Sequence, residues 1–240
     1  MNTKSDASLR WFDLHSHCLP GMDDGAENVE MSLRMLHTMK GQGVDWAALT
    51  PHYYPHKEEL VPFINRREAA FRRLIDRREP DLPELVLGAE IYIVRGLSEQ
   101  DLRPLCIGGT RLLLLELPRQ SYKPWILEEL QNITYALDII PVLAHVERYL
   151  SWYGRRDFEE LLSFEELVLQ CNAESLLDRR LFRFLYTLAS EDYPMVLGSD
   201  AHNTGDRAPR FAEAQAALSK KRKGQMLLSC LQKGMEVLTR

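Results

Sequence analysis

Histidines and carboxylates recur in this 240-residue chain at places where short apolar runs end. His15 and His17 form an HxH pair, and residues i and i+2 of an extended strand project from one face, about 6 to 7 Å apart. Two imidazoles placed in this way chelate one metal ion. Further candidate ligands follow later runs: Asp24, His52, Glu90, Glu116, His145, Asp200 and His202. Mixed imidazole and carboxylate ligation suits manganese, iron or zinc.

The elements that must position these side chains alternate between short apolar runs and stretches of helical period, which indicates parallel strands joined by crossover helices. The expected strands are Trp11–Leu14, Val44–Leu49, Leu85–Ile93, Arg111–Leu117, Ile139–Val146, Leu167–Asn172 and Met195–Ser199. The expected helices are 28–40 with Asn28 as N-cap, a segment containing Leu60 to Ile75, 124–137, 157–165, 174–190, 211–218 and 226–238. In a parallel barrel the strand ends of one sense meet at one rim, so the candidate ligands are predicted to form a single cup.

Composition favours one soluble α/β domain. The chain has a formal charge of −5 and 45% apolar residues, and it offers no broad basic face for nucleic acid. Its apolar runs, such as Leu112 to Leu115, are far shorter than the ~20 residues of a membrane span, so we expect no membrane insertion. The polar residues 1–10 predict a flexible N-terminal tail, and four scattered cysteines predict free thiols in a cytoplasmic protein.

Several strand-end motifs resemble the polymerase and histidinol phosphatase (PHP) superfamily, and within it the bacterial manganese-dependent tyrosine-protein phosphatases of capsule and exopolysaccharide systems. The motifs are DLHSH at 13–17, DDG at 23–25, TPH at 50–52, GAEIY at 88–92, LLEL at 114–117, PVLAHVERY at 141–149 and SDAHN at 199–203. The resemblance runs nearly end to end. It implies that residues 11–240 form one PHP-type phosphatase domain, a distorted (β/α)7 TIM-like barrel.

The resemblance also implies three divalent metal ions, preferably manganese, with iron or zinc as alternatives. His15, His17, Glu90 and Asp200 would hold the first ion, and Glu90 as a bridge would hold the second with Glu116 and His145. Asp24, His52 and His202 would hold the third. Arg148 and Arg207 look like the phosphate-contacting arginines of the family.

Charge and chemistry agree with this assignment. Four carboxylates gathered in one cup repel one another unless cations accompany them, and three divalent ions would make the cup net positive, as a phosphate dianion requires. Paired ions could lower the pKa of a bridging water toward ~7 to supply the nucleophile. Asp24, His52 or His202 would protonate the leaving phenolate or hold the ion that does so, while Tyr53, Tyr54 and Trp125 are candidates to flank an aromatic substrate.

We therefore expect an enzyme that hydrolyses phosphotyrosine in proteins, with the phosphorylated tail of a bacterial tyrosine autokinase as partner. The alternatives are a small-molecule phosphomonoesterase such as a histidinol phosphatase, an amidohydrolase barrel, and a non-catalytic regulatory partner. An amidohydrolase usually bridges its metals through a lysine, whereas this chain offers Glu90 and Glu116. A cysteine-nucleophile phosphatase is rejected because only four residues, rather than five, separate Cys106 from Arg111.

Overall fold

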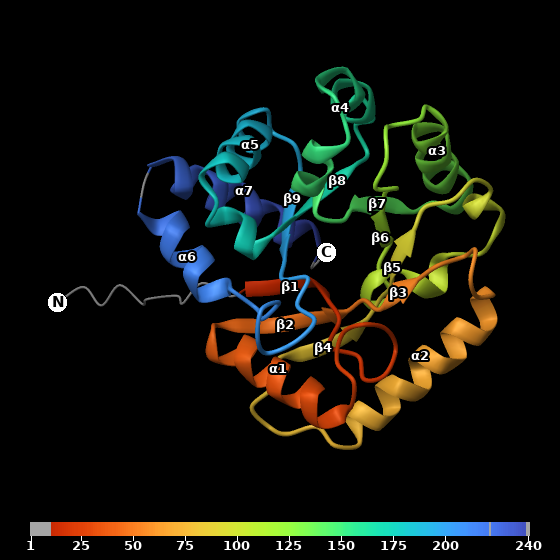
Figure 1. Ribbon diagram of the computed structural model, residues 1–240, viewed down its shortest axis with the longest axis vertical. Helices are drawn as coiled ribbons and strands as arrows, with labels where there is room; N and C mark the ends of the chain where they lie inside the picture. Colours follow the sequence, from red (N-terminus) through yellow and green to blue (C-terminus); the bar gives the residue numbers. More distant parts are fainter. Residues whose placement is uncertain (1–10, 221, 239–240) are drawn as a thin grey trace.

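Parallel strands form the centre of the computed structural model, which describes residues 11–220 and 222–238, and helices surround them (Figure 1). The strands are β1 (Trp11–Ser16), β2 (Val44–Leu49), β3 (His52–Tyr53), β4 (Glu84–Leu87), β5 (Glu90–Tyr92), β6 (Leu112–Glu116), β7 (Ile140–Leu143), β8 (Val168–Asn172) and β9 (Met195–Gly198). The helices are α1 (Val29–Gly41), α2 (Leu60–Ile75), α3 (Trp125–Leu137), α4 (Arg155–Leu161), α5 (Arg179–Ser190), α6 (Phe211–Ser219) and α7 (Arg222–Leu238). The predicted α/β class with parallel strands is confirmed.

The strands pair as two sheets, in the orders β1-β2-β4 and β3-β5-β6-β7-β8-β9, and every pairing is parallel. An isolated parallel bridge joins Ser16, at the end of β1, to Ala201 beyond β9. The amide of Asp200 also donates to the carbonyl of His15 at 2.7 Å. The predicted closed barrel is not shown, because continuous strand pairing does not run around a full ring.

The prediction of seven unbroken strands is wrong for the described chain, because the run predicted as Leu85–Ile93 is divided into β4 and β5 at Gly88. A Cβ atom at Gly88 would lie only 2.9 Å from the Cγ1 atom of Ile107, so this close approach requires glycine. The neighbouring break between β2 and β3 falls at Pro51, which has no N–H to donate. Backbone hydrogen bonds from Gly88 to Leu49 and from Glu90 to Pro51, both 3.0 Å, lie beside these breaks.

The predicted helices are present, although α4, α5 and α7 begin at other residues than predicted, α7 at Arg222 instead of 226. The side chain of Asn28 accepts from the amide of Met31 at 2.9 Å and begins α1, as predicted. The helix predicted over 174–190 instead begins at Arg179, because the Asp178 carboxylate accepts from two amides of the first turn of α5. The helix predicted over 157–165 is α4, which begins and ends earlier in the chain. The predicted N-terminal tail, residues 1–10, lies outside the described residues.

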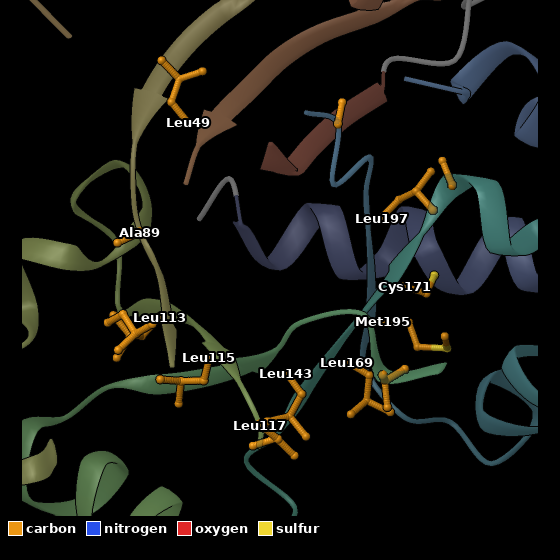
Figure 2. Packing of buried hydrophobic residues seen from close by; sticks show 14 of the residues in the cluster. Leu49, Ala89, Leu113, Leu115, Leu117, Leu143, Leu169, Cys171, Met195 and Leu197 are labelled. Atoms are coloured by element: carbon orange, nitrogen blue, oxygen red, sulfur yellow. The ribbon is translucent and has the colours of Figure 1, made fainter. Parts of the chain in front are cut away.

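Apolar side chains pack on both sides of the strands. The larger cluster lies between the strands and the helices, and Figure 2 shows part of it, including Leu113 and Leu115 from β6 and Leu169 from β8. A smaller cluster collects residues on the other side of the strands, together with Ile107 from the segment before β6 and Ala144 just after β7. Its members are Leu14, Ala48, Ile107, Leu112, Leu114, Val142, Ala144, Val168 and Val196. Successive residues of a strand face opposite sides, so Glu116 lies on the same face of β6 as Leu112 and Leu114. The smaller cluster therefore lies directly beside the predicted cup.

Within the described residues, no helix combines the length and the apolar character needed to cross a membrane.

Candidate metal centre

The structure brings all nine predicted ligands together at the carboxyl ends of the strands. Their side chains fall into three overlapping groups, and within each group one potential ligand atom per residue lies within 4.8 Å of the others. The groups are His17, Asp24, His52 and His202; His15, His17 and Asp200; and His52, Glu90 and Glu116. His145 joins through Glu90, since its Nε2 atom lies 3.0 Å from Glu90 Oε1 and 3.9 Å from Glu116 Oε1. Residues spread from 15 to 202 thus share one cluster, which is buried except for Asp24 and part of His52.

Glu90 occupies the centre of this cluster, as the bridging role predicted for it requires. Its Oε2 atom lies 3.3 Å from Nε2 of His15 and 3.4 Å from Nε2 of His17. The same oxygen lies 2.8 Å from Nδ1 of His52, and the other carboxylate oxygen faces His145. Four imidazoles therefore surround one fully buried carboxylate.

Three histidine rings are held by oxygen acceptors that are not themselves candidate ligand atoms. Nδ1 of His15 lies 3.0 Å from the Gln170 side-chain oxygen, and Nδ1 of His17 lies 2.7 Å from an Asp23 oxygen. Nδ1 of His202 lies 2.9 Å from the Asp200 carbonyl. An oxygen acceptor places the proton on Nδ1 and leaves the Nε2 lone pair for a ligand, as is typical around metal sites. The Nε2 atoms of His15 and His17 converge to 3.1 Å.

Asp23 and Gln170 are functional residues that the sequence reasoning missed. Asp23 also accepts from the amide of His52 at 2.9 Å, so one carboxylate positions two candidate ligands. Gln170 likewise accepts from the amide of His145 at 2.7 Å. Asp23 belongs to the DDG motif, so its role could have been predicted from the sequence. Gln170 lies inside a predicted apolar strand, where no sequence pattern indicates its role.

Unpaired buried polar atoms test whether this cluster suits a cation. Oε2 of Glu90 and Nε2 of His202 are buried and make no hydrogen bond of good geometry in the described part of the chain, although imidazole nitrogens lie close to Oε2. Such atoms are costly in a fold unless something else satisfies them, and a divalent cation would do so. The donor set contains imidazoles and carboxylates but no thiolate, which suits a catalytic cation rather than a structural zinc. The residues fit the predicted metal ions.

Electrostatic coupling within the cluster is strong. Burial would raise the pKa of Glu90, but the charge of His15 and hydrogen bonds from neighbouring imidazoles hold that pKa well below its usual value. Burial would lower the pKa of His17, yet the charge of Asp23 and the nearby carboxylates hold it well above normal. Burial, together with the charge of His17, lowers the pKa of His202 to about 4. Glu90 therefore stays ionised and favours positive charge beside it.

Backbone geometry at two strand ends is unusual. His145 and Asp200 adopt positive φ angles of 34° and 52°. Left-handed backbone is uncommon for residues other than glycine, and strained conformations of this kind concentrate at functional sites. Each residue lies two positions beyond the end of a strand, β7 at Leu143 and β9 at Gly198, so the chain bends where these side chains enter the cluster.

Guanidinium groups lie beside the carboxylates, as predicted for Arg148 and Arg207. Nη2 of Arg148 pairs with Oδ2 of Asp200, and Nη2 of Arg207 lies 3.3 Å from Oδ1 of the same residue. Nη1 of Arg207 also reaches Asp24 at 3.5 Å. Asp24 is the one candidate ligand with a largely exposed side chain, at 64%. Both arginines remain partly exposed and therefore accessible to an anion.

A third guanidinium in the same place was missed from the sequence. Arg119 follows β6, and its Nε and Nη2 atoms donate to Oε1 of Glu116 at 3.1 and 2.7 Å. Its neighbours Pro118 and Gln120 carry no motif, so only the position three residues after Glu116 could have drawn attention to it.

An open cavity of about 430 Å³ joins these groups. Its lining comprises Asp24, His52, Tyr54, Glu90, Tyr92, Glu116, Arg119, His145, Arg148, Asp200 and Arg207. Of the aromatic candidates, Tyr54 lines the cavity. Tyr53 does not, because its side chain is buried against Phe63 with ring centroids 4.7 Å apart. Trp125 lies instead beneath the Arg95 guanidinium.

The cysteine alternative finds no support in the structure. Cys106 is buried, and burial raises the pKa of its thiol to about 11. A thiol in this state is a poor nucleophile near neutral pH. Cys106 also does not line the cavity that holds the arginines.

The chain matches a known protein family. The family model described as "Capsular polysaccharide synthesis, CpsB/CapC" matches residues 11–237. The chain belongs to this family. It is 29% identical to the tyrosine-protein phosphatase YwqE of Bacillus subtilis (strain 168), over 87% of the chain and 84% of the relative. It is 27% identical to the tyrosine-protein phosphatase CpsB of Streptococcus pneumoniae, over 87% of the chain and 90% of the relative.

A solved structure of a CpsB/CapC relative shares the fold. It comes from work on YwqE from Bacillus subtilis and CpsB from Streptococcus pneumoniae, described as unique metal-dependent tyrosine phosphatases. The TM-score is 0.75, the sequence identity is 23%, and the match covers 95% of this chain and 94% of the other. The arrangement of helices and strands is therefore that of the solved relative.

Proposed function

We propose that this protein is a metal-dependent protein-tyrosine phosphatase that hydrolyses phosphotyrosine esters. The observation that carries the proposal is one cavity in which a buried cluster of imidazoles and carboxylates lies beside three partly exposed arginines. A phosphate monoester needs cations on several sides, because phosphoryl transfer depends chiefly on positioning and charge stabilisation. The names of the relatives support the same activity.

The metal assignment is part of the proposal. His15, His17, Glu90 and Asp200 hold one divalent ion; Glu90, Glu116 and His145 hold a second; Asp24, His52 and His202 hold a third. Manganese is preferred. When bound, such ions polarise phosphoryl oxygens and lower the pKa of water so that a nucleophile is available at neutral pH. The contacts of Glu90 with four imidazoles support its place between the sites.

The arginines of the chain bind and orient the phosphate. Arg148 and Arg207 both contact Asp200 and keep part of each guanidinium open to the cavity. Their planar forks match the spacing of phosphate oxygens, so they hold the ester in one orientation while the carboxylates retain the metals. Asp24 or His202 would protonate the leaving oxygen, or would instead hold the ion that does so. A phenolate needs less of this help than an alkoxide.

The setting of the activity follows from the family. The matched description concerns capsular polysaccharide synthesis, and we infer that the substrate is the phosphorylated tail of a tyrosine autokinase in that system. Four free cysteines, of which three are buried, fit a cytoplasmic protein. We also infer that residues 11–240 form one PHP-type domain and that the two sheets act as a single distorted seven-stranded barrel. The Ser16–Ala201 bridge supports this inference, as do the hydrogen bonds at Gly88 and Glu90.

A substrate panel tests the function. Purified protein is given a phosphotyrosine peptide, a phosphoserine peptide, histidinol phosphate and a nucleotide, each with and without added manganese. We expect phosphate release from the phosphotyrosine peptide, lost on chelation and in the His15→Ala variant. Activity on histidinol phosphate alone would overturn the substrate assignment. No turnover of any ester would favour a non-catalytic partner.

A further inference from the structure

Aromatic rings gather on one wall of the cavity, outside the ligand cluster. The Tyr54 and Tyr92 ring centroids lie 5.9 Å apart, and the His56 ring lies 5.8 Å from each of them. Tyr54 also lies 5.2 Å from the ring of His52, a candidate metal ligand. Both tyrosines line the cavity and are partly exposed, whereas Tyr53, the residue before Tyr54, is buried. The aromatic wall therefore starts at the metal cluster and extends toward solvent.

Tyr54 also contacts a cation. The Lys57 ammonium lies 4.0 Å from the centroid of the Tyr54 ring. A second hollow of about 580 Å³ shares Asp24, His52 and Tyr54 with the first and is otherwise lined by Met22, Asp23, Lys57, Glu58 and Arg66. Tyr54 thus lies at the boundary between two neighbouring hollows, together with Asp24 and His52.

The phosphate and the wall lie at different depths. Glu90, Glu116 and His145 have side chains exposed by 3% or less, so the reacting phosphorus must descend below the two tyrosine rings. A phosphotyrosine side chain carries an aryl ring between its phosphate and the peptide backbone, whereas a phosphoserine side chain is much shorter. Aromatic pairs attract one another beyond their burial of area, in offset or tilted arrangements.

We propose that Tyr54 and Tyr92 form an aryl-binding wall that receives the phenyl ring of the substrate and makes the site selective for aryl over alkyl phosphates. The inference rests on the proposed function, since it assigns the part of the same cavity that contacts the ester's organic group. Tyr54 and Tyr92 contribute to the binding of the aryl ring, whereas the arginines and the metal ligands contribute to the binding and reaction of the phosphoryl group.

The test measures binding rather than turnover. Calorimetry on manganese-loaded protein compares phenylphosphonate, methylphosphonate and inorganic phosphate for the parent, the double variant Tyr54→Leu/Tyr92→Leu, and Tyr54→Phe/Tyr92→Phe. Tyr135→Leu is the matched control, because Tyr135 is a 68% exposed tyrosine on α3. We expect the parent to bind phenylphosphonate about tenfold more tightly than methylphosphonate, and the leucine variant to lose that preference.

Further readouts separate the wall from the metal cluster. Affinity for inorganic phosphate should be unchanged in the leucine variant, and the phenylalanine variant and Tyr135→Leu should retain the aryl preference. An aryl preference that survives in the leucine variant overturns the inference, as does an equal loss for all three ligands. Failure of the parent to hydrolyse any phosphotyrosine peptide would instead overturn the proposed function, whatever the binding preference.

Discussion

The small apolar cluster and the metal cluster lie next to each other and are built from the same alternating positions of the strands. One is apolar, whereas the other consists of ionisable side chains. On β6, Leu112 and Leu114 belong to the small apolar cluster, and the next residue of that face, Glu116, belongs to the metal cluster. On β8, Val168 lies in the apolar cluster, and Gln170 holds the ring of His15. The alternation of the strand is unchanged across this boundary. The difference lies only in residue type.

This contrast separates stability from chemistry. The apolar cluster is removed from water and stabilises the fold through burial. The metal cluster buries ionisable groups, which opposes folding unless each is paired or bound to a cation. We expect substitutions in the two regions to affect different measurements, although the residues concerned can be only two positions apart.

The largest effect is expected for Glu90→Gln, which keeps the size of the side chain but removes its charge. The kcat on a phosphotyrosine peptide should fall about a thousandfold, because several kcal/mol of charge stabilisation depend on the metals that Glu90 binds. The urea midpoint of the metal-free protein should also fall somewhat, because the neighbouring imidazoles that hold the pKa of Glu90 below its usual value lose their counter-charge. A variant that unfolds at a lower urea concentration than the parent but keeps the kcat of the parent would contradict this, because Glu90 would then act in stability and not in chemistry.

The opposite result is expected for Leu114→Ala in the apolar cluster. Leu114 is fully buried, so its truncation should lower the free energy of unfolding by about 2–5 kcal/mol. Urea unfolding measures this change. The kcat of the folded fraction should remain that of the parent, and a large loss of kcat at full folding would show that the two regions are not separable.

An intermediate effect is expected for Asp23→Asn, which weakens the hydrogen bond that orients His17. Metal affinity, measured by competition with a chelator, should fall about 10- to 100-fold, as for other residues that orient ligating histidines. Asp157→Asn is the matched control, because Asp157 accepts from the Gly154 amide at the start of α4 and is not one of the candidate ligands or their partners. Equal metal affinity for Asp23→Asn and the parent would contradict the positioning role.

A smaller effect is expected for Arg119→Gln. Removal of one half-exposed cation from the cavity should raise KM for phosphotyrosine about threefold to tenfold, with little change in bound metal. Arg103→Gln is the control, since Arg103 pairs with Asp101 through the same two guanidinium nitrogens, Nε and Nη2, on the exposed surface. An unchanged KM would remove Arg119 from substrate binding.

The smallest effect is expected for Cys106→Ser. The activity of the folded enzyme should stay within about twofold of the parent, because a buried thiol with a pKa of about 11 takes no part in the chemistry. Alkylation of the native protein with iodoacetamide should be slow at this residue for the same reason. A loss of kcat without unfolding would restore the cysteine mechanism.

Sequence patterns predicted the fold where the backbone was regular. The periodicity of α1 and the apolar runs of β8 and β9 were placed to within a residue or two, because local propensity and burial agree there. The interruption at Gly88 was missed because it depends on Ile107, which approaches from a distant part of the chain. Such tertiary contacts leave no local periodic signal.

The site was predictable to the extent that its ligands are chemically distinctive. His15 and His17 stand out in a sequence, and the parallel topology converts strand-end positions into spatial proximity. Gln170 and Arg119 are ordinary residue types whose roles depend on where their side chains reach. The positive φ angles of His145 and Asp200 are likewise properties of the folded chain.

Metal content measured alongside activity tests the central claim most directly. Protein stripped with a chelator is titrated with manganese, and bound metal and phosphate release from a phosphotyrosine peptide are determined on the same samples. The account predicts no hydrolysis without metal and a rise in activity that saturates at about three ions per chain, the number in the proposed assignment of the ligands. Full hydrolysis by protein that holds less than one ion per chain would contradict it.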